Sequence, residues 1–397
     1  MLLLSVFLAI LAVCQCKVEF SDRARNFSVE LLYYTAEETH WHTVISPLGV
    51  WSLLTGISTG ATGNSKAQLR RSLLLPKRTT TVVEGHKKLM SDVVLPKTKD
   101  VTLKSVNYLF VDTGFVINPV FHNSIVYDFG AKVTRLRFSS PDDAAAKANG
   151  VIQKSGATVS NVLRSDDFQN SRVILTNVIT FKGLWRLPFN ESETKVLPFH
   201  DEKMNEIGKV NMMQQQENFQ FSNIASISAT VLELPYGEDD HYSFLVILPY
   251  LDVTLAEVYT ALERVSVKEI LEKLRRDTEE YGEASVIVNL PRFKISTNVV
   301  LNRPLYNMGV IDIFDPQAAS FKQISNTESL HVSAIVHKAD IEVTETGTIA
   351  SAATSAYFAD RALPANFNAN RPFLYFVVEK STATIIFSGV YSKPTVF

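Results

Sequence analysis

The sequence predicts an α+β fold in one domain, on three observations. The chain has 397 residues, 46% hydrophobic and 20% charged, so it can bury a large core. Helical periodicity dominates its first half, whereas runs of β-branched and aromatic residues dominate the second. No internal repeat and no Gly/Ser/Pro-rich linker divides it, so we expect residues 17–397 to form a single domain.

The clearest helix is expected over residues 47–60. Ser46 is placed to cap its start and Pro47 lies in the first turn. The apolar residues of this segment recur at i, i+3, i+4 and i+7, before a terminal glycine: Val50, Leu53, Leu54, Ile57, Gly60. Two further helices are expected over Asp142–Lys154 and Leu255–Leu274.

Strands are expected wherever β-branched and aromatic residues cluster, at residues 101–111, 173–181, 229–234, 242–248, 284–290, 331–343 and 373–391. Between the last two strands lies the long segment Thr344–Asn370. A loop of this length inside a compact domain is unusual and is commonly functional.

The N-terminus reads as a secretory signal peptide over residues 1–16. Its apolar run, Leu2–Val13, is too short to span a bilayer, and no later window is long and apolar enough to do so. Both cysteines, Cys14 and Cys16, lie in this segment, so we expect a secreted protein without disulfides. Two N-glycosylation sequons, at Asn26 and Asn190, agree with secretion.

Overall charge limits the classes of partner. With 39 basic and 41 acidic side chains the net charge is −2, which does not support nucleic-acid or acidic-surface binding as the main activity. The sequence also gives no reason to expect a cofactor, a metal ion or a membrane anchor, and we expect a monomer.

Small residues fill the first part of the long loop. As a strand it would place Thr348, Ala350, Ala352, Thr354 and Ala356 on one face and Ile349, Ser351, Ala353 and Ser355 on the other. Neither face would obstruct insertion between two existing strands, and Gly347 supplies a flexible hinge. The alternative from these features alone is an ordinary surface loop with an incidental arginine at position 361.

Several collinear motifs resemble the serpin family over almost the whole chain. The most specific is Phe367–Val377, and the others agree with it in order: Ile45–Pro47, Gly60–Leu69, Asn177–Trp185, Glu233–Tyr236, Leu290–Phe293 and Val336–Ala339. The resemblance implies three β-sheets, eight to nine helices and an exposed reactive-centre loop, here about residues 345–366.

The resemblance also implies the loop's functional positions. The hinge would comprise Glu345, Gly347, Thr348, Ile349, Ala350, Ser351, Ala352, Ala353 and Thr354. Counting 14 residues on from Gly347, or 11 back from Pro372, gives Arg361 as the bait residue and Arg361–Ala362 as the bond that a protease cleaves. Ile349 and Thr346 stand where the family usually has acidic residues; Ile349 lies opposite Thr348 and should be tolerated.

The implied activity is inhibition of a trypsin-like serine protease. The protease would form an acyl-enzyme at Arg361, and the cut loop would insert into the central sheet before water resolves the ester. The inhibitor then needs no catalytic residue of its own. The alternative is a noninhibitory serpin that acts as a carrier, chaperone or protease substrate.

Two further sets of residues follow from the resemblance. Ser46, Asn177 and His337 resemble the polar cluster beneath the opening sheet. Four lysines, Lys87, Lys88, Lys97 and Lys99, lie where some serpins bind heparin-like polyanions, although such a spread is usually a solvated face.

Two patterns suggest other chemistry and are not favoured. Ser58 lies in a Gly-x-Ser-x-Gly pattern, but a hydrolase needs this serine between a strand and a helix, and here it ends a helix. His40 and His42 could share one side of a strand, but a metal site needs a third ligand, and none is near in sequence.

Overall fold

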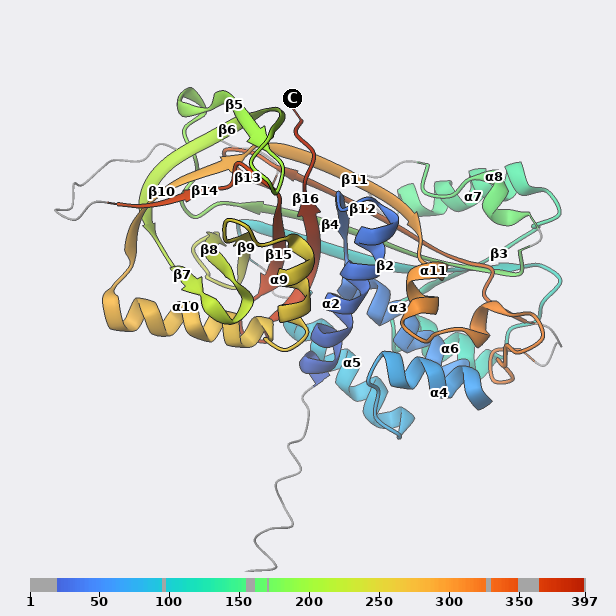
Figure 1. Cartoon of the computed structure of the whole chain (residues 1–397). Coiled ribbons are helices and arrows are strands. Elements are labelled where there is room, and N and C mark those ends of the chain that lie inside the picture. The colour runs from blue at the N-terminus through green and yellow to red at the C-terminus, as the bar shows by residue number, and fades with distance from the viewer. Residues whose placement is uncertain are drawn as a thin grey trace, which may run out of the picture.

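The computed structural model describes residues 20–94, 98–154, 161–169, 171–325, 330–348 and 364–395. These residues form three β-sheets with helices packed around them (Figure 1), so the predicted α+β class with three sheets is confirmed. The signal segment 1–16 lies outside the described residues.

The helices have the following bounds: α2 Phe20–Glu38, α3 Pro47–Gly60, α4 Gly63–Ser72, α5 Thr79–Val93, α6 Pro119–Tyr127, α7 Pro141–Lys154, α8 Ser165–Phe168, α9 Leu255–Leu262, α10 Val267–Tyr281 and α11 Asn302–Asn307. Short 3₁₀ turns lie at η1 Glu191–Glu193, η2 Ala225–Ile227 and η3 Asp312–Phe314. The predicted helix over 47–60 is confirmed, with the Ser46 side chain accepting a hydrogen bond from the N–H of Gly49.

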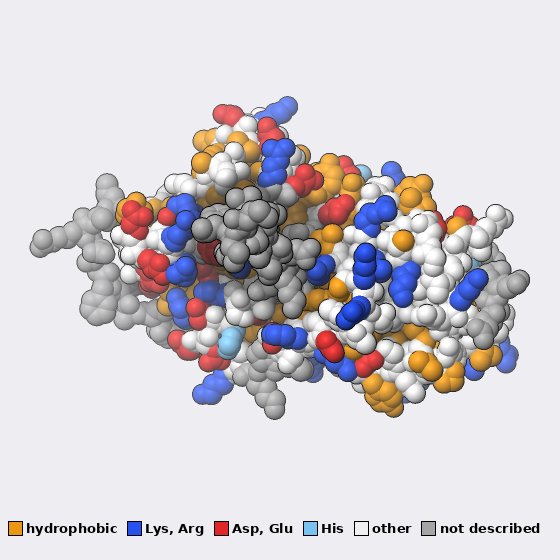
Figure 2. All heavy atoms as spheres, turned by 90° about the horizontal axis from the view of Figure 1, so that it is seen from below, with side chains coloured by type: hydrophobic (Ala, Val, Ile, Leu, Met, Phe, Trp, Pro, Cys, Tyr) orange, Lys and Arg blue, Asp and Glu red, His pale blue; other side chains and the backbone are white. Residues whose placement is uncertain are grey.

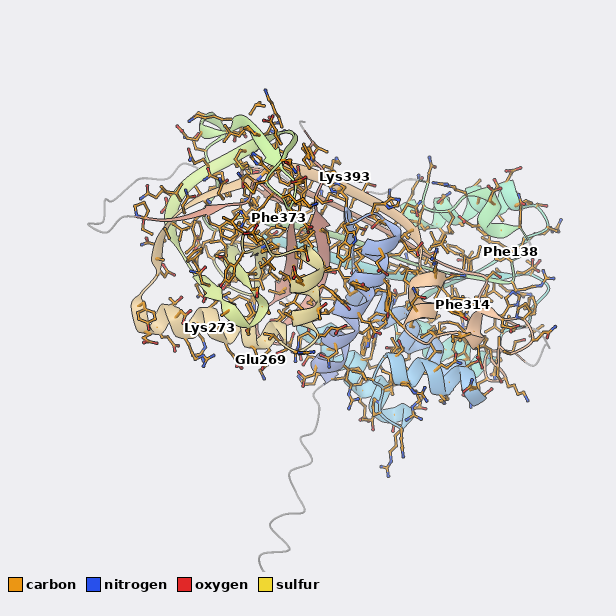
Figure 3. The ribbon with its side chains drawn as sticks, in the orientation of Figure 1. Phe138, Glu269, Lys273, Phe314, Phe373 and Lys393 are labelled. Atoms are coloured by element: carbon orange, nitrogen blue, oxygen red, sulfur yellow. The ribbon has the colours of Figure 1, made fainter. Side chains whose placement is uncertain are left out.

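The single helix expected over Leu255–Leu274 is wrong, because two helices occupy this segment. Thr254 and Glu257 form a capping box that starts α9, and Ser266 and Glu269 form another that starts α10. A second set of cap hydrogen bonds within the segment allows the chain to change direction and begin a new helix. In Figure 3, Glu269 and Lys273 lie along α10.

Sheet A has the strand order β11-β12-β4-β2-β3, with the short β13 paired to β4. Its strands are β2 Val101–Asp112, β3 Lys132–Leu136, β4 Val173–Leu184, β11 Phe293–Val300, β12 Ala334–Val343 and β13 Gly347–Thr348. It extends along much of the molecule (Figure 1).

Sheets B and C complete the β-structure. Sheet B has the order β1-β16-β15-β9-β8-β7, formed by Thr43–Ile45, Thr384–Tyr391, Phe373–Glu379, Tyr242–Pro249, Ala229–Tyr236 and Phe221–Ile224. Sheet C has the order β14-β10-β6-β5, formed by Ala365–Asn368, Ala284–Pro291, Glu206–Phe219 and Lys195–His200. The expected run 373–391 is thus an antiparallel pair, with Ala383 at positive φ before the return strand.

Two apolar cores lie on opposite faces of sheet A. On one face, α7 and α8 cover Tyr108, Phe110 and Val178, and Phe138 meets Phe168 edge-on at 4.9 Å between ring centres. On the other face, the buried helix α3 and sheet B share the main core, which includes Phe373 (Figure 3). Sheet A therefore rests on the buried helix α3, whose start carries Ser46.

In the described part of the chain, no helix is both long enough and apolar enough to cross a bilayer.

Candidate functional site: the seam of sheet A and the loop hinge

The strands β4 and β12 meet at a parallel seam inside sheet A. These strands pair in parallel over only Ala334–Ala339 and Ile174–Ile179, and beyond these residues their pairing ends. The neighbouring ladders, β2 with β4 and β11 with β12, are antiparallel and longer. Parallel pairing is slightly less stable per residue than antiparallel pairing, so this seam is weaker than the two ladders that border it.

The chain leaves the C-terminal end of β12 in a tight turn and then runs antiparallel to β4. The N–H of Thr344 donates to the carbonyl oxygen of Gly347 at 2.9 Å, and the Thr344 Oγ1 donates to the same oxygen at 2.8 Å. Gly347 and Thr348 then pair antiparallel with Leu184 and Gly183 of β4. The start of the loop is thus already part of sheet A.

Residues just after β4 hold this turn in place. Trp185 donates its Nε1–H to the carbonyl oxygen of Thr344 at 2.9 Å and its backbone N–H to that of Thr346 at 3.1 Å. Phe189 donates its N–H to the carbonyl oxygen of Glu345 at 2.7 Å. The Glu345 carboxylate, itself buried, accepts a 2.7 Å hydrogen bond from Thr194 Oγ1.

Thr348 is the first inserted side chain, and it points into the core. It is 1% exposed, and its Oγ1 lies 2.7 Å from the hydroxyl of Tyr236 on β8. Burial raises the pKa of Tyr236, so its hydroxyl stays protonated.

Gly347 is required where it lies, since its φ of +143° is one that side chains with a Cβ rarely adopt. A Cβ added there would meet the carbonyl oxygen of Gly183 at 2.2 Å and the Cα of Leu184 at 2.8 Å. Close contact between the hinge and β4 therefore depends on glycine.

Ser46, Asn177 and His337, the set that the family resemblance implies, lie together at the seam. Asn177 on β4 and His337 on β12 are direct partners in the ladder. The N–H of Ser46 donates to His337 Nε2 at 2.9 Å, and Ser46 Oγ donates to the carbonyl oxygen of Ile386 at 2.8 Å. Burial lowers the pKa of His337 to about 3, so the imidazole is neutral.

This cluster continues into a chain of buried polar residues that the sequence did not reveal. Asn177 Nδ2 donates to Asn107 Oδ1 at 2.8 Å, and Asn107 Nδ2 donates to Ser52 Oγ at 3.1 Å. Ser52 Oγ lies 2.7 Å from Nε2 of His86 on α5. Each pair is more than 30 positions apart in sequence, so no local pattern could have found it.

Two atoms of the cluster have no hydrogen-bond partner among the described residues. They are Asn177 Oδ1 and His337 Nδ1, both buried in the middle of sheet A. Gly49 packs against the Asn177 amide, where any larger residue would collide with it. An unsatisfied buried polar group lowers the stability of the folded state by about 1–3 kcal/mol, so these two atoms destabilise the closed sheet at its seam.

The remaining loop positions lie outside the described residues. They are Ile349, Ala350, Ser351, Ala352, Ala353 and Thr354 of the hinge, together with Arg361 and Ala362. Both predicted sequon asparagines are exposed: Asn26 on α2, and Asn190 at the start of η1. Asn190 Oδ1 accepts hydrogen bonds from the backbone and side chain of Ser192.

Two of the predicted lysines form ion pairs on α5. Lys87 pairs with Asp128 at 2.7 Å and Lys88 with Asp92 at 2.6 Å, whereas Lys97 lies outside the described residues and Lys99 lies before β2. Seen from below, Lys and Arg side chains are scattered over the surface, not aligned in a stripe (Figure 2).

The two competing patterns have structural explanations. Ser58 is buried within α3 and donates to the carbonyl oxygen of Thr55 at 2.7 Å, so it is not the nucleophile of a hydrolase. His42 Nδ1 accepts hydrogen bonds from the N–H groups of Ser392 and Lys393. Among the described residues, no group of three or more His, Cys, Asp or Glu side chains could hold a metal ion.

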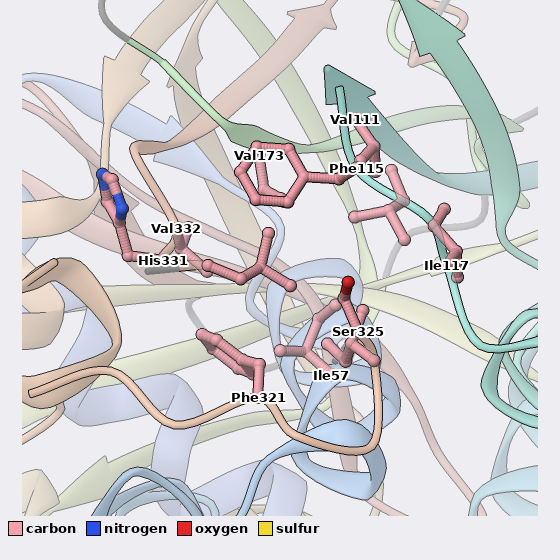
Figure 4. Close-up of a pocket in the computed structure, with 12 residues that line it drawn as sticks. Ile57, Val111, Phe115, Ile117, Val173, Phe321, Ser325, His331 and Val332 are labelled. Carbon is pink, nitrogen blue, oxygen red and sulfur yellow. The ribbon is translucent and has the colours of Figure 1, made fainter. Parts of the chain in front are cut away.

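A cavity at the lower end of sheet A is too small for a ligand. Ile57, Phe115, Val173, Phe321 and other apolar residues line it (Figure 4), and its volume is about 10 Å³. Such a space holds at most one water molecule.

We predict that the protein loses stability as the pH falls below about 6.5. Burial lowers the pKa of His337 to about 3 and of His86 to about 4, so both histidines gain protons more readily when unfolded. Between pH 6.5 and the lowered pKa, each histidine should reduce the free energy of unfolding by about 1.4 kcal/mol per pH unit. Melting temperature measured at fixed scan rate between pH 8 and pH 4 tests this. A midpoint equal at pH 7 and pH 5 would contradict the assignment, and His337→Gln should flatten the dependence.

We predict that Gly347→Ala expels the hinge from sheet A, because its Cβ would collide with Gly183 and Leu184. Hydrogen exchange of residues 344–348 and 183–185 should speed up by about tenfold or more. The control is Gly150→Ala, since the Cβ at this helical position meets nothing within 4 Å. Unchanged exchange in Gly347→Ala would contradict the hinge contact.

Comparison with known proteins agrees with this arrangement. The family model described as "Serpin (serine protease inhibitor)" matches residues 22–394. The chain is 31% identical to the leukocyte elastase inhibitor of Xenopus tropicalis, over 94% of this chain and 99% of that protein. It is 32% identical to serpin B8 of Bos taurus, over 93% and 98%.

Among solved structures, native protease nexin-1 with heparin superposes with a TM-score of 0.80 at 27% identity, covering 94% of this chain and 99% of that one. The extent of these matches and the identity above 30% confirm both the serpin fold and the expectation of an inhibitor-family protein in place of an enzyme. The chain belongs to the serpin family.

Proposed function

We propose that this serpin traps a trypsin-like serine protease that cleaves it between Arg361 and Ala362. The target's serine Oγ attacks the carbonyl carbon of Arg361, the bond to Ala362 breaks, and the new amine leaves with a proton. Arg361 stays esterified to the protease. Insertion of the freed loop into sheet A must then outpace hydrolysis of this ester.

The main support for this proposal is that the hinge is already paired with the C-terminal end of β4. Gly347 and Thr348 already run antiparallel to β4 between the separated ends of β4 and β12. If the loop follows them, one parallel ladder is replaced by two antiparallel ladders, which pair more favourably. The inserting segment would therefore start at Gly347 and run antiparallel to both β4 and β12.

The register of the hinge supports a specific end point. Thr348 pairs with Gly183, and each residue further along an antiparallel strand moves one residue back along β4. Thr354 would then lie opposite Asn177 and on the same buried face as Thr348. Its hydroxyl can donate to Asn177 Oδ1 and accept from His337 Nδ1, the two atoms without partners in the closed sheet. Insertion would remove the local cost that the closed seam carries.

We also propose that the protein is secreted after removal of residues 1–16. The exposed side chains of Asn26 and Asn190 support glycosylation at both sequons. A heparin-like polyanion is a further proposed partner, supported by the similarity to native protease nexin-1 with heparin and by Lys87 and Lys88 on α5. The ion pairs of these two lysines make that contact the weaker part of the proposal.

The noninhibitory alternative, a carrier, chaperone or protease substrate, has less support. A pocket between α2 and the start of α10 has a volume of about 230 Å³, and Glu30 and Glu263 line it. Burial and the charge of Glu263 raise the pKa of Glu30. A groove of about 650 Å³ between α2 and α5 opens beside Phe20, where the described chain begins. Neither feature identifies a cargo.

We predict that Arg361→Ala abolishes covalent complex formation with trypsin, since the acidic primary pocket of trypsin has nothing to bind. Complexes that resist SDS should appear on gels for the wild type and be absent for the variant. The Arg361→Lys variant is the matched control and should keep the complex. Equal complex formation by Arg361→Ala would place the cleaved bond elsewhere.

We predict that Thr348→Arg converts the inhibitor into a substrate, because it places a charge where Thr348 is 1% exposed. The matched control is Ile349→Arg, whose side chain would lie on the opposite face of the inserted strand. Gel analysis with trypsin should show cleaved Thr348→Arg protein without complex, and complex for Ile349→Arg. The reverse result would mean that the inserting face is assigned wrongly.

A further inference from the structure

The last turn of α10 carries an exposed tyrosine, Tyr281. The helical spacing places Tyr281 on the same stripe as Ile270 and Leu274, both of which are buried. Tyr281 nevertheless keeps 77% of its side chain exposed. In Figure 1 this end of α10 lies at the left of the described structure, where the chain turns toward β10. The helix therefore extends beyond the core, and a side chain that the apolar pattern would bury is accessible.

The chain that follows Tyr281 stays open to solvent until β10 begins. Gly282 ends the helix with a φ of +83°, and its N–H donates to the carbonyl oxygen of Thr278 at 2.9 Å. A Cβ added at Gly282 would meet nothing within 4 Å, and Glu283 is exposed as well. An enzyme can therefore approach Tyr281 from several sides, and a helix end can unwind locally to fit an active site.

Acidic residues flank Tyr281 on both sides in sequence. They are Asp277, Glu279, Glu280 and Glu283. The first two pair with basic residues one turn earlier on α10, whereas no ion pair among the described residues includes Glu280 or Glu283. Both of these carboxylates are exposed. An enzyme with a basic active-site cleft would be attracted to this segment.

The phenol of Tyr281 is a protonated nucleophile. A hydrogen bond with Glu280 and the charge of that carboxylate raise the pKa of Tyr281. Its hydroxyl therefore does not ionise by itself near neutral pH, and an enzyme that uses it must supply a base. In the part of the chain that the structure describes, no group of three or more His, Cys, Asp or Glu side chains could hold a metal ion, so a metal site does not account for the flanking carboxylates.

Two other accessible tyrosines lack these neighbours. Tyr127 is 78% exposed on α6 and Tyr306 is 54% exposed on α11. Within five positions on either side, Tyr127 has one acidic residue, Asp128, which pairs with Lys87. Tyr306 has none within the same distance. Exposure alone does not distinguish Tyr281, but its acidic surroundings do.

We propose that Tyr281 is a site of tyrosine sulfation. The donor is an activated sulfate, a nucleotide in which sulfate is joined to phosphate as a mixed anhydride. The phenol oxygen attacks the sulfur atom, a new oxygen–sulfur bond forms, and the sulfur–oxygen bond to the phosphate breaks. The nucleotide leaves with its phosphate and the phenol proton passes to a base of the sulfotransferase, so no oxidant or reductant is needed.

The charges on both sides of this reaction agree with the acidic segment. Because the donor nucleotide is anionic, a sulfotransferase needs a basic active site, and such a site also attracts Glu280 and Glu283. The inference rests on the proposed secretion, since tyrosine sulfotransferases act on proteins that pass through the secretory pathway. Sulfation would add a permanent negative charge to the end of α10.

The test expresses the full chain in animal cells and collects the protein from the medium. Trypsin should release Asp277–Arg292 as one peptide, in which Tyr281 is the only tyrosine. Mass spectrometry should show this peptide with one added sulfuryl group, which phosphatase does not remove. The matched control Tyr281→Phe should lose the added mass, and the peptides that contain Tyr127 and Tyr306 should be unmodified.

A second comparison tests the acidic flank. The double variant Glu280→Gln/Glu283→Gln should lower the sulfated fraction of the peptide about tenfold or more, as loss of charge attraction to the enzyme allows. The control Glu206→Gln/Glu238→Gln removes two exposed carboxylates elsewhere on the surface and should match the wild type.

The possible results separate sulfation from secretion. Secreted protein with an unmodified Tyr281 would overturn the inference and leave secretion standing, and an added group that phosphatase removes would overturn sulfation in favour of phosphorylation. Sulfation unchanged in Glu280→Gln/Glu283→Gln would overturn recognition through the acidic flank. Protein retained in the cells would overturn both secretion and sulfation. Trapping at Arg361 is tested separately by the covalent complex with trypsin.

Discussion

The parallel contact between β4 and β12 is the constraint on which the rest of this structure depends. An antiparallel strand placed between the members of a parallel pair would replace one parallel ladder with two antiparallel ladders, which are more stable per residue. Sheet A has this pair along Ala334–Ala339, and it is bordered by two longer antiparallel ladders. Separating β4 from β12 would break this parallel contact and leave the two antiparallel ladders paired.

The polar cluster lies within the paired part of the seam, and the hinge lies at the C-terminal ends of β4 and β12. In the cluster, the backbone N–H of Ser46 donates to His337, and Asn177 is hydrogen-bonded to Asn107 on β2. At the hinge, Thr348 is buried against Tyr236. The closed state is therefore held together across the seam and also prepared to open, with two unsatisfied polar atoms at the position that an inserting Thr354 would reach.

The sequence predicted those features that are encoded locally. Ser46, Pro47 and the helical spacing that follows defined α3, and the small residues after Gly347 marked the insertable segment. The single helix expected at 255–274 is wrong because the capping box of Ser266 and Glu269 starts a second helix inside a continuous apolar pattern. The polar chain through Ser52, His86 and Asn107 and the burial of Thr348 against Tyr236 depend on contacts between distant strands and helices, which one sequence does not show. The cluster of Ser46, Asn177 and His337 was accessible only through family resemblance.

The most direct test of the central claim is to cut the loop without trapping a protease and to measure stability. A metalloprotease or cysteine protease that cleaves between Ser355 and Ala362 forms no lasting ester with the chain, so only the loop changes. If the freed segment enters the seam between β4 and β12, the cleaved protein, still associated as two fragments, should unfold at a clearly higher temperature than the intact protein. A cleaved protein that unfolds at the same or a lower temperature would contradict insertion at this seam.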